Sequence, residues 1–581
     1  MRRRFHIRVE WLALSAALLI TAATYLQSAF FEFVYDDFGQ IVYNPKIKSF
    51  RLTLTYFTSN VWSQVTDIGL YYRPLYMVWL RVNHAFFGLE PLYWHLTAIT
   101  LHLLVCLLLY FFVYRLTQSK WVAIVSVLLF GLHPAHVESV AWISGTTESL
   151  LASMLLGSLL CYWKHRDRAH KKPNSWLAAS LLLAFFGTLV KESAIIIPAL
   201  IFSYEWIFCR QDASRRVRLW ASFRPAIPYA LVSFGYLVMR ALALKSLTPP
   251  ATPVGRLHAL LAWPEAIAFY TAHALFPFHM SVFYNLMMVS HPGLQNFALP
   301  LILMFTGAAL LFYGSRRSRV FAFLAAWSAI TLIPILNVTL WNNAENLHDR
   351  YLYLPSVAVC IALASLIARL KELHYDISAL GALIVIVAGY SFVTVREMRY
   401  WRDDYVLAQH GIEVSPGHPI APQLMAGVLI GREKITEAIP YLVDALDAMP
   451  TNVATLCELG FCYAEINALP LAEECLGKAI ALRGSEPRAH LVLGMVRLKQ
   501  GRLQEAEAEC RRGIELQPVS KGVLVYHYYL GNVLYAKGDV QGALREYRAE
   551  LQNDAAIDTA FANAQERVDE IERQFRLQVR Q

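Results

Sequence analysis

The chain has 581 residues, of which 56% are hydrophobic and only 16% are charged. No soluble globular protein of this length needs so many apolar residues, so the composition excludes that class and indicates a polytopic membrane protein. The formal net charge of +9 comes from short basic clusters between apolar runs. It therefore reflects membrane topology, and we expect no nucleic-acid partner.

Eleven apolar runs approach the roughly 20 residues that a bilayer requires. They cover residues 11–30, 95–114, 121–135, 146–163, 175–190, 193–209, 225–244, 298–314, 319–338, 352–370 and 376–395. Basic clusters fall in every second gap, as at Arg2 to Arg4 and at Arg210 to Arg218. Because positively charged loops stay inside, those gaps are cytoplasmic. We expect an all-α membrane bundle of about eleven spans, with a cytoplasmic N-terminus and an extracytoplasmic tail.

One further apolar segment, residues 257–278, contains Trp263-Pro264-Glu265 and two histidines. If it crossed the membrane, the basic cluster around Arg316 would lie outside. We interpret it as a helix that lies on, or re-enters from, the outer face. A genuine span with a less regular topology is the alternative.

From about Trp401 the long apolar runs stop and a repeat of 34 residues begins. Small residues recur at this spacing, as in Ala426, Gly460 and Gly494, and let the two helices of a hairpin approach closely. This pattern resembles the tetratricopeptide repeat. We expect about four repeats in residues 401–558, an insertion near 519–523, and a capping helix at 559–581 that gives the last repeat a polar outer face.

Two adjacent carboxylates, Asp36 and Asp37, follow the first apolar run. A carboxylate in hydrocarbon is costly and usually functional, so the pair must face water or a partner. Either residue is suited to act as general base for a hydroxyl acceptor or as a metal ligand. A solvated helix cap is the alternative.

Three basic residues on the predicted outer face are suited to a phosphate group. Arg73 and Arg350 carry guanidinium groups, which form paired hydrogen bonds with phosphate oxygens. Lys191, beside Glu192, is either another phosphate contact or part of a structural ion pair. The alternative for Arg73 is an arginine packed among interfacial aromatic residues. For Arg350 and its neighbour Tyr351 it is a membrane-interface anchor.

Three histidines, two glutamates and one tyrosine are candidate donor or substrate contacts: His102, His133, His136, Glu138, Glu148 and Tyr351. Imidazole and carboxylate together suit a divalent metal. Pro134, however, breaks a regular helical ligand face between His133 and His136. We favour donor or acceptor contacts and leave the metal open, with no cofactor certain. For His102 the alternative is a hydrogen-bonded core histidine.

These motifs occur in one order along the chain: Asp36-Asp37, Tyr72-Arg73-Pro74-Leu75, His133-Pro134-Ala135-His136-Val137-Glu138, Lys191-Glu192 and Arg350-Tyr351-Leu352-Tyr353-Leu354-Pro355-Ser356. With the repeat tail they resemble the GT-C superfamily of membrane glycosyltransferases. The closest group is the transmembrane and tetratricopeptide-repeat O-mannosyltransferases and their bacterial relatives. The resemblance covers nearly the whole chain, with residues 1–400 as the transmembrane catalytic domain.

The resemblance implies an enzyme that transfers a sugar, mannose or another hexose, from a polyprenyl-phosphate carrier to an acceptor outside the cytosol. A protein hydroxyl is the expected acceptor, and the repeats are expected to hold it. On this resemblance Asp36 or Asp37 is the base, while Arg73 and Arg350 contact the carrier phosphate. The membrane is the bacterial inner membrane or that of the endoplasmic reticulum.

Two other classes of function remain alternatives. A non-enzymatic membrane scaffold would use the spans to anchor the repeats for envelope assembly. A transporter of the lipid carrier would need polar groups at mid-bilayer. The sequence concentrates them at one face, which counts against transport.

Overall fold

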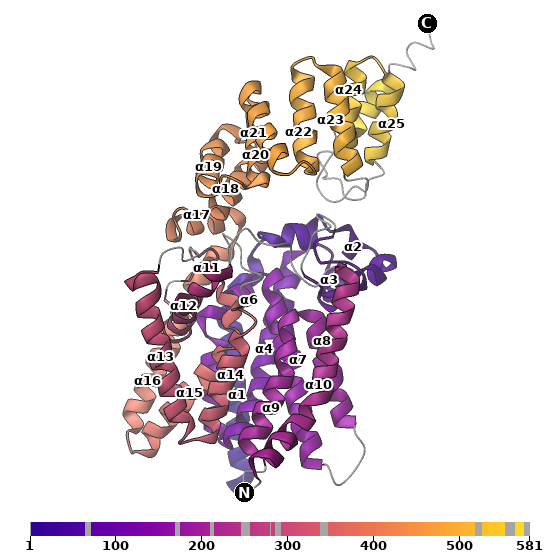
Figure 1. Cartoon of the computed structure of the whole chain (residues 1–581). Helices are drawn as coiled ribbons and strands as arrows, with labels where there is room; N and C mark the ends of the chain where they lie inside the picture. The colour runs from indigo at the N-terminus through magenta and orange to yellow at the C-terminus, as the bar shows by residue number, and fades with distance from the viewer. Residues whose placement is uncertain are drawn as a thin grey trace. The chain divides into compact units, whose positions relative to one another are not determined.

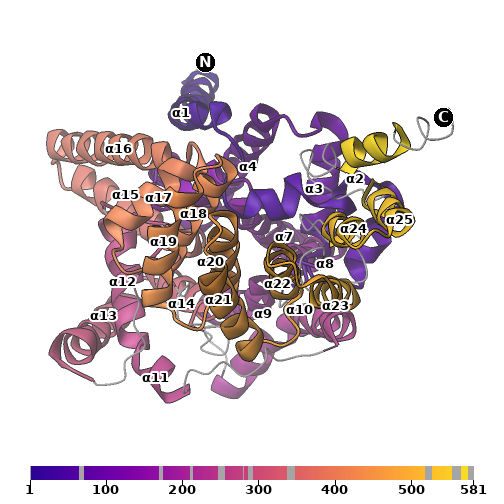
Figure 2. The same cartoon turned by 90° about the horizontal axis from the view of Figure 1, so that it is seen from above.

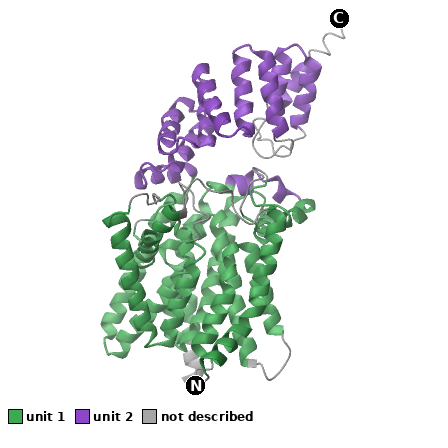
Figure 3. Ribbon diagram, in the orientation of Figure 1, with its two compact units in different colours: residues 1–37, 50–63, 68–403 green, residues 38–49, 64–67, 404–581 purple. Residues whose placement is uncertain are grey.

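The computed structural model describes residues 2–63, 71–168, 175–209, 214–245, 256–278, 280–284, 292–336, 347–516, 526–551 and 564–573. Within these ranges every regular element is a helix and no residue forms a strand, which confirms the all-α fold expected from the sequence. The chain divides into two compact units, shown in Figure 3. The first consists of residues 1–37, 50–63 and 68–403, and the second of residues 38–49, 64–67 and 404–581.

The first unit is a bundle of helices, most of them long (Figure 1). In chain order they are α1 (Arg2–Tyr25), α3 (Pro74–Phe87), α4 (Pro91–Thr117), α5 (Lys120–Gly131), α6 (Val137–Ala141), α7 (Thr147–Arg168), α8 (Ser175–Val190), α9 (Ile197–Phe208), α10 (Arg215–Leu244), α11 (Arg256–Leu261), α12 (Trp263–Leu275), α13 (Leu299–Ser315), α14 (Arg319–Leu332), α15 (Ser356–Glu372) and α16 (Asp376–Met398). Each of the eleven apolar runs found in the sequence overlaps one of these helices.

Five helical stretches of the described chain are long and apolar enough to cross a bilayer: Val9–Phe30, Pro91–Thr117, Arg215–Leu244, Leu294–Ser315 and Asp376–Trp401. A sixth candidate is the pair Lys120–Gly131 and Pro134–Ala141, which is bent by 59°. Several predicted spans are thus confirmed as candidates, while the total of about eleven stays a prediction. The segment 257–278 forms α11 and α12, of 6 and 13 residues. Each is shorter than a bilayer requires.

Some helices of the bundle are buried in its interior, whereas others expose apolar side chains on its outer surface. Half of the apolar window of α4 is buried, against 6% for α13, which Figure 2 shows at the edge of the bundle together with α16. On α13 the side chains of Leu303 and Phe305 are more than half exposed. Such apolar surface is unfavourable in water and is typical of a membrane interface.

The second unit contains α2 (Pro45–Lys48), α17 (Asp404–Val414) and a stack of helical hairpins (Figure 1). The hairpins in the described residues pair α18 (Ile420–Gly431) with α19 (Ile435–Ala448), α20 (Val453–Glu465) with α21 (Leu469–Leu482), α22 (Pro487–Lys499) with α23 (Leu503–Leu516), and α24 (Tyr526–Ala536) with α25 (Val540–Leu551). The small residues that recur every 34 positions are buried where the helices meet. Gly494 is an example, since a Cβ there would lie 2.6 Å from the Cys510 sulfur.

The predicted end of the tail is described in part. Residues 564–573 are helical, and Ala564 is fully buried. Val568 and Ile571 pack into the apolar cluster of α24 and α25. The predicted insertion at 519–523 and the rest of the predicted cap, residues 559–563 and 574–581, lie outside the described residues. All eight cysteines are free thiols.

The close approach at Gly494 yields a prediction about stability. In Gly494→Ala the added methyl group must displace the Cys510 sulfur, so we expect the repeats to lose about 1–3 kcal/mol. The matched control is Gly427→Ala in α18, because a Cβ at Gly427 meets nothing within 4 Å. There the higher helix propensity of alanine should add about 0.5–1 kcal/mol. Urea unfolding of the full chain in detergent, followed by circular dichroism, measures both changes. Equal stability of the two variants would contradict the packing.

Candidate active site

The Asp36–Asp37 loop leaves the first helical stretch at Phe30 and turns sharply at Tyr35. Tyr35 has a left-handed backbone, with φ at +53°, which a side chain other than glycine adopts only when its surroundings impose it. Asp37 is fully buried. Its Oδ1 accepts hydrogen bonds from the Ser144 backbone N–H at 2.8 Å and the Ser144 hydroxyl at 2.6 Å. Its Oδ2 accepts one from the Val34 N–H at 3.2 Å.

The two neighbouring carboxylates therefore occupy different surroundings. Asp37 joins its own loop to the turn before α7, whereas Asp36 remains partly exposed. The turn at Ser144 depends on the next residue, Gly145, because a Cβ there would lie 2.3 Å from the Glu138 carbonyl oxygen. Only glycine lets this turn pass so close to α6.

Tyr76, one helical turn after Arg73, is influenced electrostatically by both aspartates and by Arg73. Burial raises the pKa of the Tyr76 hydroxyl, the negative charge of Asp37 raises it further, and Arg73 opposes that rise. Asp36 also contributes to the shift. The aspartate loop and Arg73 thus share one electrostatic environment.

The three basic residues singled out in the sequence each meet a carboxylate. The pairs are Arg73 with Glu192, Lys191 with Glu148, and Arg350 with Glu138. Each pair joins two separate elements, and two of the carboxylates, Glu138 and Glu148, are almost completely buried. A buried charge without a partner costs several kcal/mol, so this pairing is a condition for packing these helix ends together.

Arg73 and Glu192 form a two-bond pair. The Arg73 Nε donates to Glu192 Oε2 at 2.9 Å, and a terminal nitrogen of Arg73 donates to Oε1 at 2.6 Å. Burial acts to raise the pKa of Glu192, but the adjacent Arg73 outweighs burial and lowers it to about 2. Glu192 is thus a carboxylate at neutral pH. The guanidinium lies 4.5 Å from the centre of the Tyr71 ring, and its side chain keeps 16% of its surface exposed.

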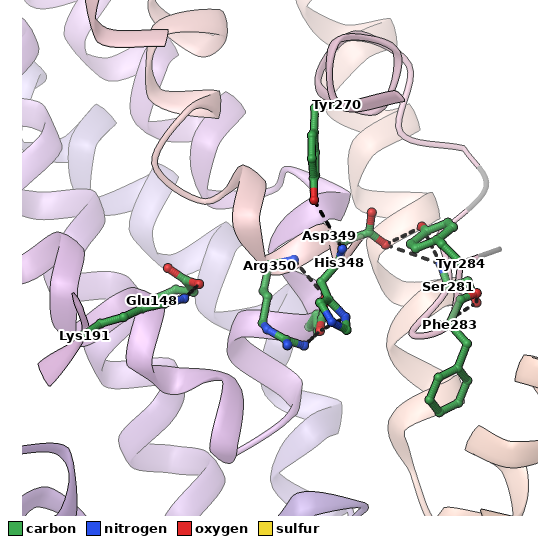
Figure 4. Close-up of polar contacts among 10 residues, drawn as sticks. Glu148, Lys191, Tyr270, Ser281, Phe283, Tyr284, His348, Asp349 and Arg350 are labelled. Atoms are coloured by element: carbon green, nitrogen blue, oxygen red, sulfur yellow. Dashed lines mark hydrogen bonds and ion pairs between the residues drawn. The ribbon is translucent and has the colours of Figure 1, made fainter. Parts of the chain in front are cut away.

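Tyr351 lies between the other two pairs. Its ring centre is 5.1 Å from the Arg350 guanidinium and 5.0 Å from the Lys191 ammonium. Figure 4 shows Lys191 against Glu148, and Arg350 beside His348. Glu138 accepts from the Arg350 side chain, and also from the Arg350 backbone N–H at 2.8 Å. Lys191 and Arg350 therefore pack against the same ring, that of Tyr351.

Asp349 makes a contact that sequence reasoning missed. Its Oδ2 accepts from the Tyr284 hydroxyl at 2.7 Å and from the Ser281 N–H at 3.3 Å (Figure 4). Burial raises the pKa of Asp349, and the nearby charge of Glu138 raises it further. Tyr284 and Ser281 lie in a stretch without a periodic pattern, so no local signal in the sequence pointed to them.

The three candidate histidines lie inside the bundle and are fully buried. His102 binds the Tyr353 hydroxyl at 2.7 Å and the Gly131 carbonyl at 3.1 Å. His133 binds the Ala274 carbonyl and caps the turn at Ala135. His136 binds the Phe130 carbonyl and the Ser356 hydroxyl, each at 2.8 Å. Within the described ranges no group of three or more histidine, cysteine or acidic residues is arranged to hold a metal.

The structure thus gathers most of the candidate residues and separates a few from them. Lys191 and Arg350 pack on the Tyr351 ring and pair with Glu148 and Glu138. Arg73 pairs with Glu192, the residue after Lys191. Trp142 connects this group to the aspartate loop, because its ring lies against both Arg350 and Tyr35. His102, His133 and His136 pack behind it with their ring nitrogens engaged internally. The side chains of Arg73 and Arg350 are mostly buried but keep some exposed surface. A site that combines an aspartate with such cations can take a proton and hold an anionic group at one place.

Known proteins resemble both the repeat part and the membrane part of this chain. A family model described as tetratricopeptide repeat matches residues 463–520. A solved tetratricopeptide-repeat protein of Thermus thermophilus is 16% identical, covering 31% of this chain and 94% of that chain, with a TM-score of 0.26. That score is too low to compare the arrangement of the repeats.

Relatives extend over the membrane part as well. The Mus musculus protein named Protein O-mannosyl-transferase TMTC3 is 22% identical over 568 residues, which cover 87% of this chain and 61% of that protein. Mus musculus TMTC1, with the same descriptive name, is 33% identical over 205 residues, or 33% of this chain and 22% of that protein. The chain spans about three fifths of the length of the first relative. With its candidate spans, it is a membrane protein related over most of its length to the transmembrane and tetratricopeptide-repeat protein O-mannosyl-transferases.

Proposed function

We propose that this chain is an integral-membrane glycosyltransferase of the GT-C type. It transfers a sugar, mannose in the first instance, from a polyprenyl-phosphate carrier to a hydroxyl of a protein outside the cytosol. Residues 1–400 form the catalytic domain, and the repeats bind the protein acceptor. The observation that carries the proposal is that the Trp142 ring lies against both Tyr35 of the aspartate loop and the Arg350 guanidinium, which brings the carboxylates and a cation to one region.

The proposed reaction is a single displacement. Asp36 takes the proton of the acceptor hydroxyl, and the acceptor oxygen forms a bond to the anomeric carbon of the sugar. The bond between that carbon and the phosphate oxygen breaks, and its electron pair stays on the phosphate. The departing phosphate is already anionic, so it needs cations more than it needs an acid.

The burial of the aspartates favours Asp36 as the base. Both oxygens of Asp37 already accept hydrogen bonds from Ser144 and Val34, and the side chain has no exposed surface. Asp36 retains access to solvent. In this proposal Asp37 shapes the loop and Asp36 does the chemistry.

Arg73 and Arg350 are the proposed phosphate contacts. Their side chains are 16% and 17% exposed, whereas the side chain of Lys191 is only 8% exposed. Some N–H groups of each guanidinium donate to a glutamate, and the remaining N–H groups can donate to phosphate oxygens. Lys191, which is paired with Glu148, then acts mainly by packing against the Tyr351 ring.

The first test separates the two aspartates. In Asp36→Asn the base is lost, so we expect sugar transfer in membranes to fall by about 100- to 10,000-fold, with a smaller change in melting temperature than in Asp37→Asn. In Asp37→Asn the hydrogen bonds of Ser144 lose their charged acceptor, so the melting temperature should fall together with activity. Transfer from a synthetic polyprenyl-phosphate mannose to a peptide library provides the measurement. Full activity in both variants would support the scaffold alternative and refute the catalytic assignment.

A second test concerns the cations. Arg350→Lys keeps the charge but loses the two-pronged geometry. We expect about a tenfold loss in kcat/KM for the carrier-linked sugar, the equivalent of one charged hydrogen bond. Arg369→Lys is the matched control, because Arg369 pairs with Glu372 at an exposed site. A loss of the same size in the control would show that the effect is not specific to the phosphate site.

A third test concerns topology. A reporter that is active only outside the cytosol, fused after Val395, should be active if the tail is extracytoplasmic. The same reporter fused after Arg317, in a predicted cytoplasmic gap, should be silent. Silence of the Val395 fusion would place the tail in the cytosol and break the proposed arrangement of the acceptor.

A further inference from the structure

Trp142 lies at the centre of the candidate active site, although it carries no charge. Its ring centre is 6.0 Å from that of Tyr35, the residue before Asp36, and 5.1 Å from the Arg350 guanidinium. A Cβ on Gly145 would lie 3.1 Å from the same indole. One buried side chain, 3% exposed, therefore contacts the aspartate loop, the turn that holds Asp37, and a proposed phosphate-binding cation.

Trp401 packs on this side chain from the end of the last candidate span. The two indoles are stacked, with ring centres 5.6 Å apart and planes inclined by 23°. Trp401 ends the short helical turn Arg399–Trp401, and it is 5% exposed. The next residue, Arg402, accepts a hydrogen bond on its carbonyl oxygen from the Glu32 N–H at 3.0 Å. Two contacts therefore join the end of this span to the region around the aspartate loop: the stack of Trp401 on Trp142, and the hydrogen bond between Arg402 and Glu32.

We infer that Trp401 is a positioning residue, which holds Trp142 and through it the geometry between Asp36 and Arg350. The inference rests on the proposed function, but its structural part does not depend on the reaction. A stacked indole restrains the plane of its partner as well as its position. Removing that plane leaves a cavity beside Trp142, and Tyr35 and Arg350 lose the surface against which they pack. Misplacement of about 1 Å in a catalytic group costs on the order of 100-fold in rate.

The kinetic test uses three substitutions at one site. Trp401→Leu keeps bulk but no flat face, and Trp401→Ala removes both. For each we expect kcat to fall by about 10- to 100-fold while the KM values for the carrier and the acceptor stay nearly constant. Trp401→Phe keeps an aromatic face and should retain most of the activity. The matched control is Trp220→Ala, because Trp220 is 64% exposed on α10, and it should leave kcat unchanged.

A second readout does not require activity. In an Asp36→Cys chain, a maleimide should label the introduced thiol at a measurable rate, since position 36 is partly exposed. Adding Trp401→Leu should raise that rate, because the loop is less restrained, whereas adding Trp220→Ala should not. The chain with Asp36 intact gives the background from the native cysteines. Melting temperatures in detergent identify any variant that fails to fold.

The outcomes separate the inference from the proposed function. If the wild type transfers no sugar, the proposed function fails, and the labelling rates still decide whether Trp401 restrains the loop. If the wild type is active and Trp401→Leu matches Trp220→Ala in both kcat and labelling, the positioning role is wrong. A rise in KM with kcat unchanged would also overturn it, because that pattern indicates binding and not alignment.

Discussion

The membrane unit depends on the pairing of charge where its helices end. Glu138 and Glu148 are buried, and neither is tolerable there without a cation at hand. Each partner comes from another element: Arg350 from the turn before α15, and Lys191 from the turn after α8. The requirement that folds these ends together also concentrates fixed positive charge near the aspartate loop, because Trp142 packs against both Arg350 and Tyr35. Stability and the proposed chemistry therefore draw on the same contacts, so changes at these residues affect both.

Much of this arrangement could be predicted because charge interrupts an otherwise apolar sequence. Every predicted apolar run overlaps a helix, and the charged residues Arg73, Lys191, Arg350 and Glu138 stand out as exceptions to the apolar pattern. The different surroundings of the two aspartates could not be predicted. They depend on Ser144, 107 residues further along the chain than Asp37. The contact between Asp349 and Tyr284 likewise joins distant segments, and nothing local in either segment indicates it.

The repeats illustrate the opposite case, in which local rules carry most of the information. A hairpin packs against its neighbours in sequence, so its small residues return at a fixed interval and are visible without a structure. Gly460 faces the Leu476 side chain within its own hairpin, much as Gly494 faces Cys510. Long-range partners matter less here. The sequence therefore specified this unit more fully than it specified the membrane unit, where partners meet across the whole bundle.

The left-handed turn at Tyr35 changes how the aspartate pair is to be understood. It places the side chains of Asp36 and Asp37 in different surroundings, so the two neighbouring carboxylates have separate structural roles. The second aspartate belongs with Ser144 and Gly145, and its evolutionary history should follow theirs: where one of them changes among relatives, the others should change with it. The first aspartate differs from the second in that its side chain is partly exposed. If the proposed chemistry holds, it should stay fixed even in relatives whose loop has been rebuilt around it.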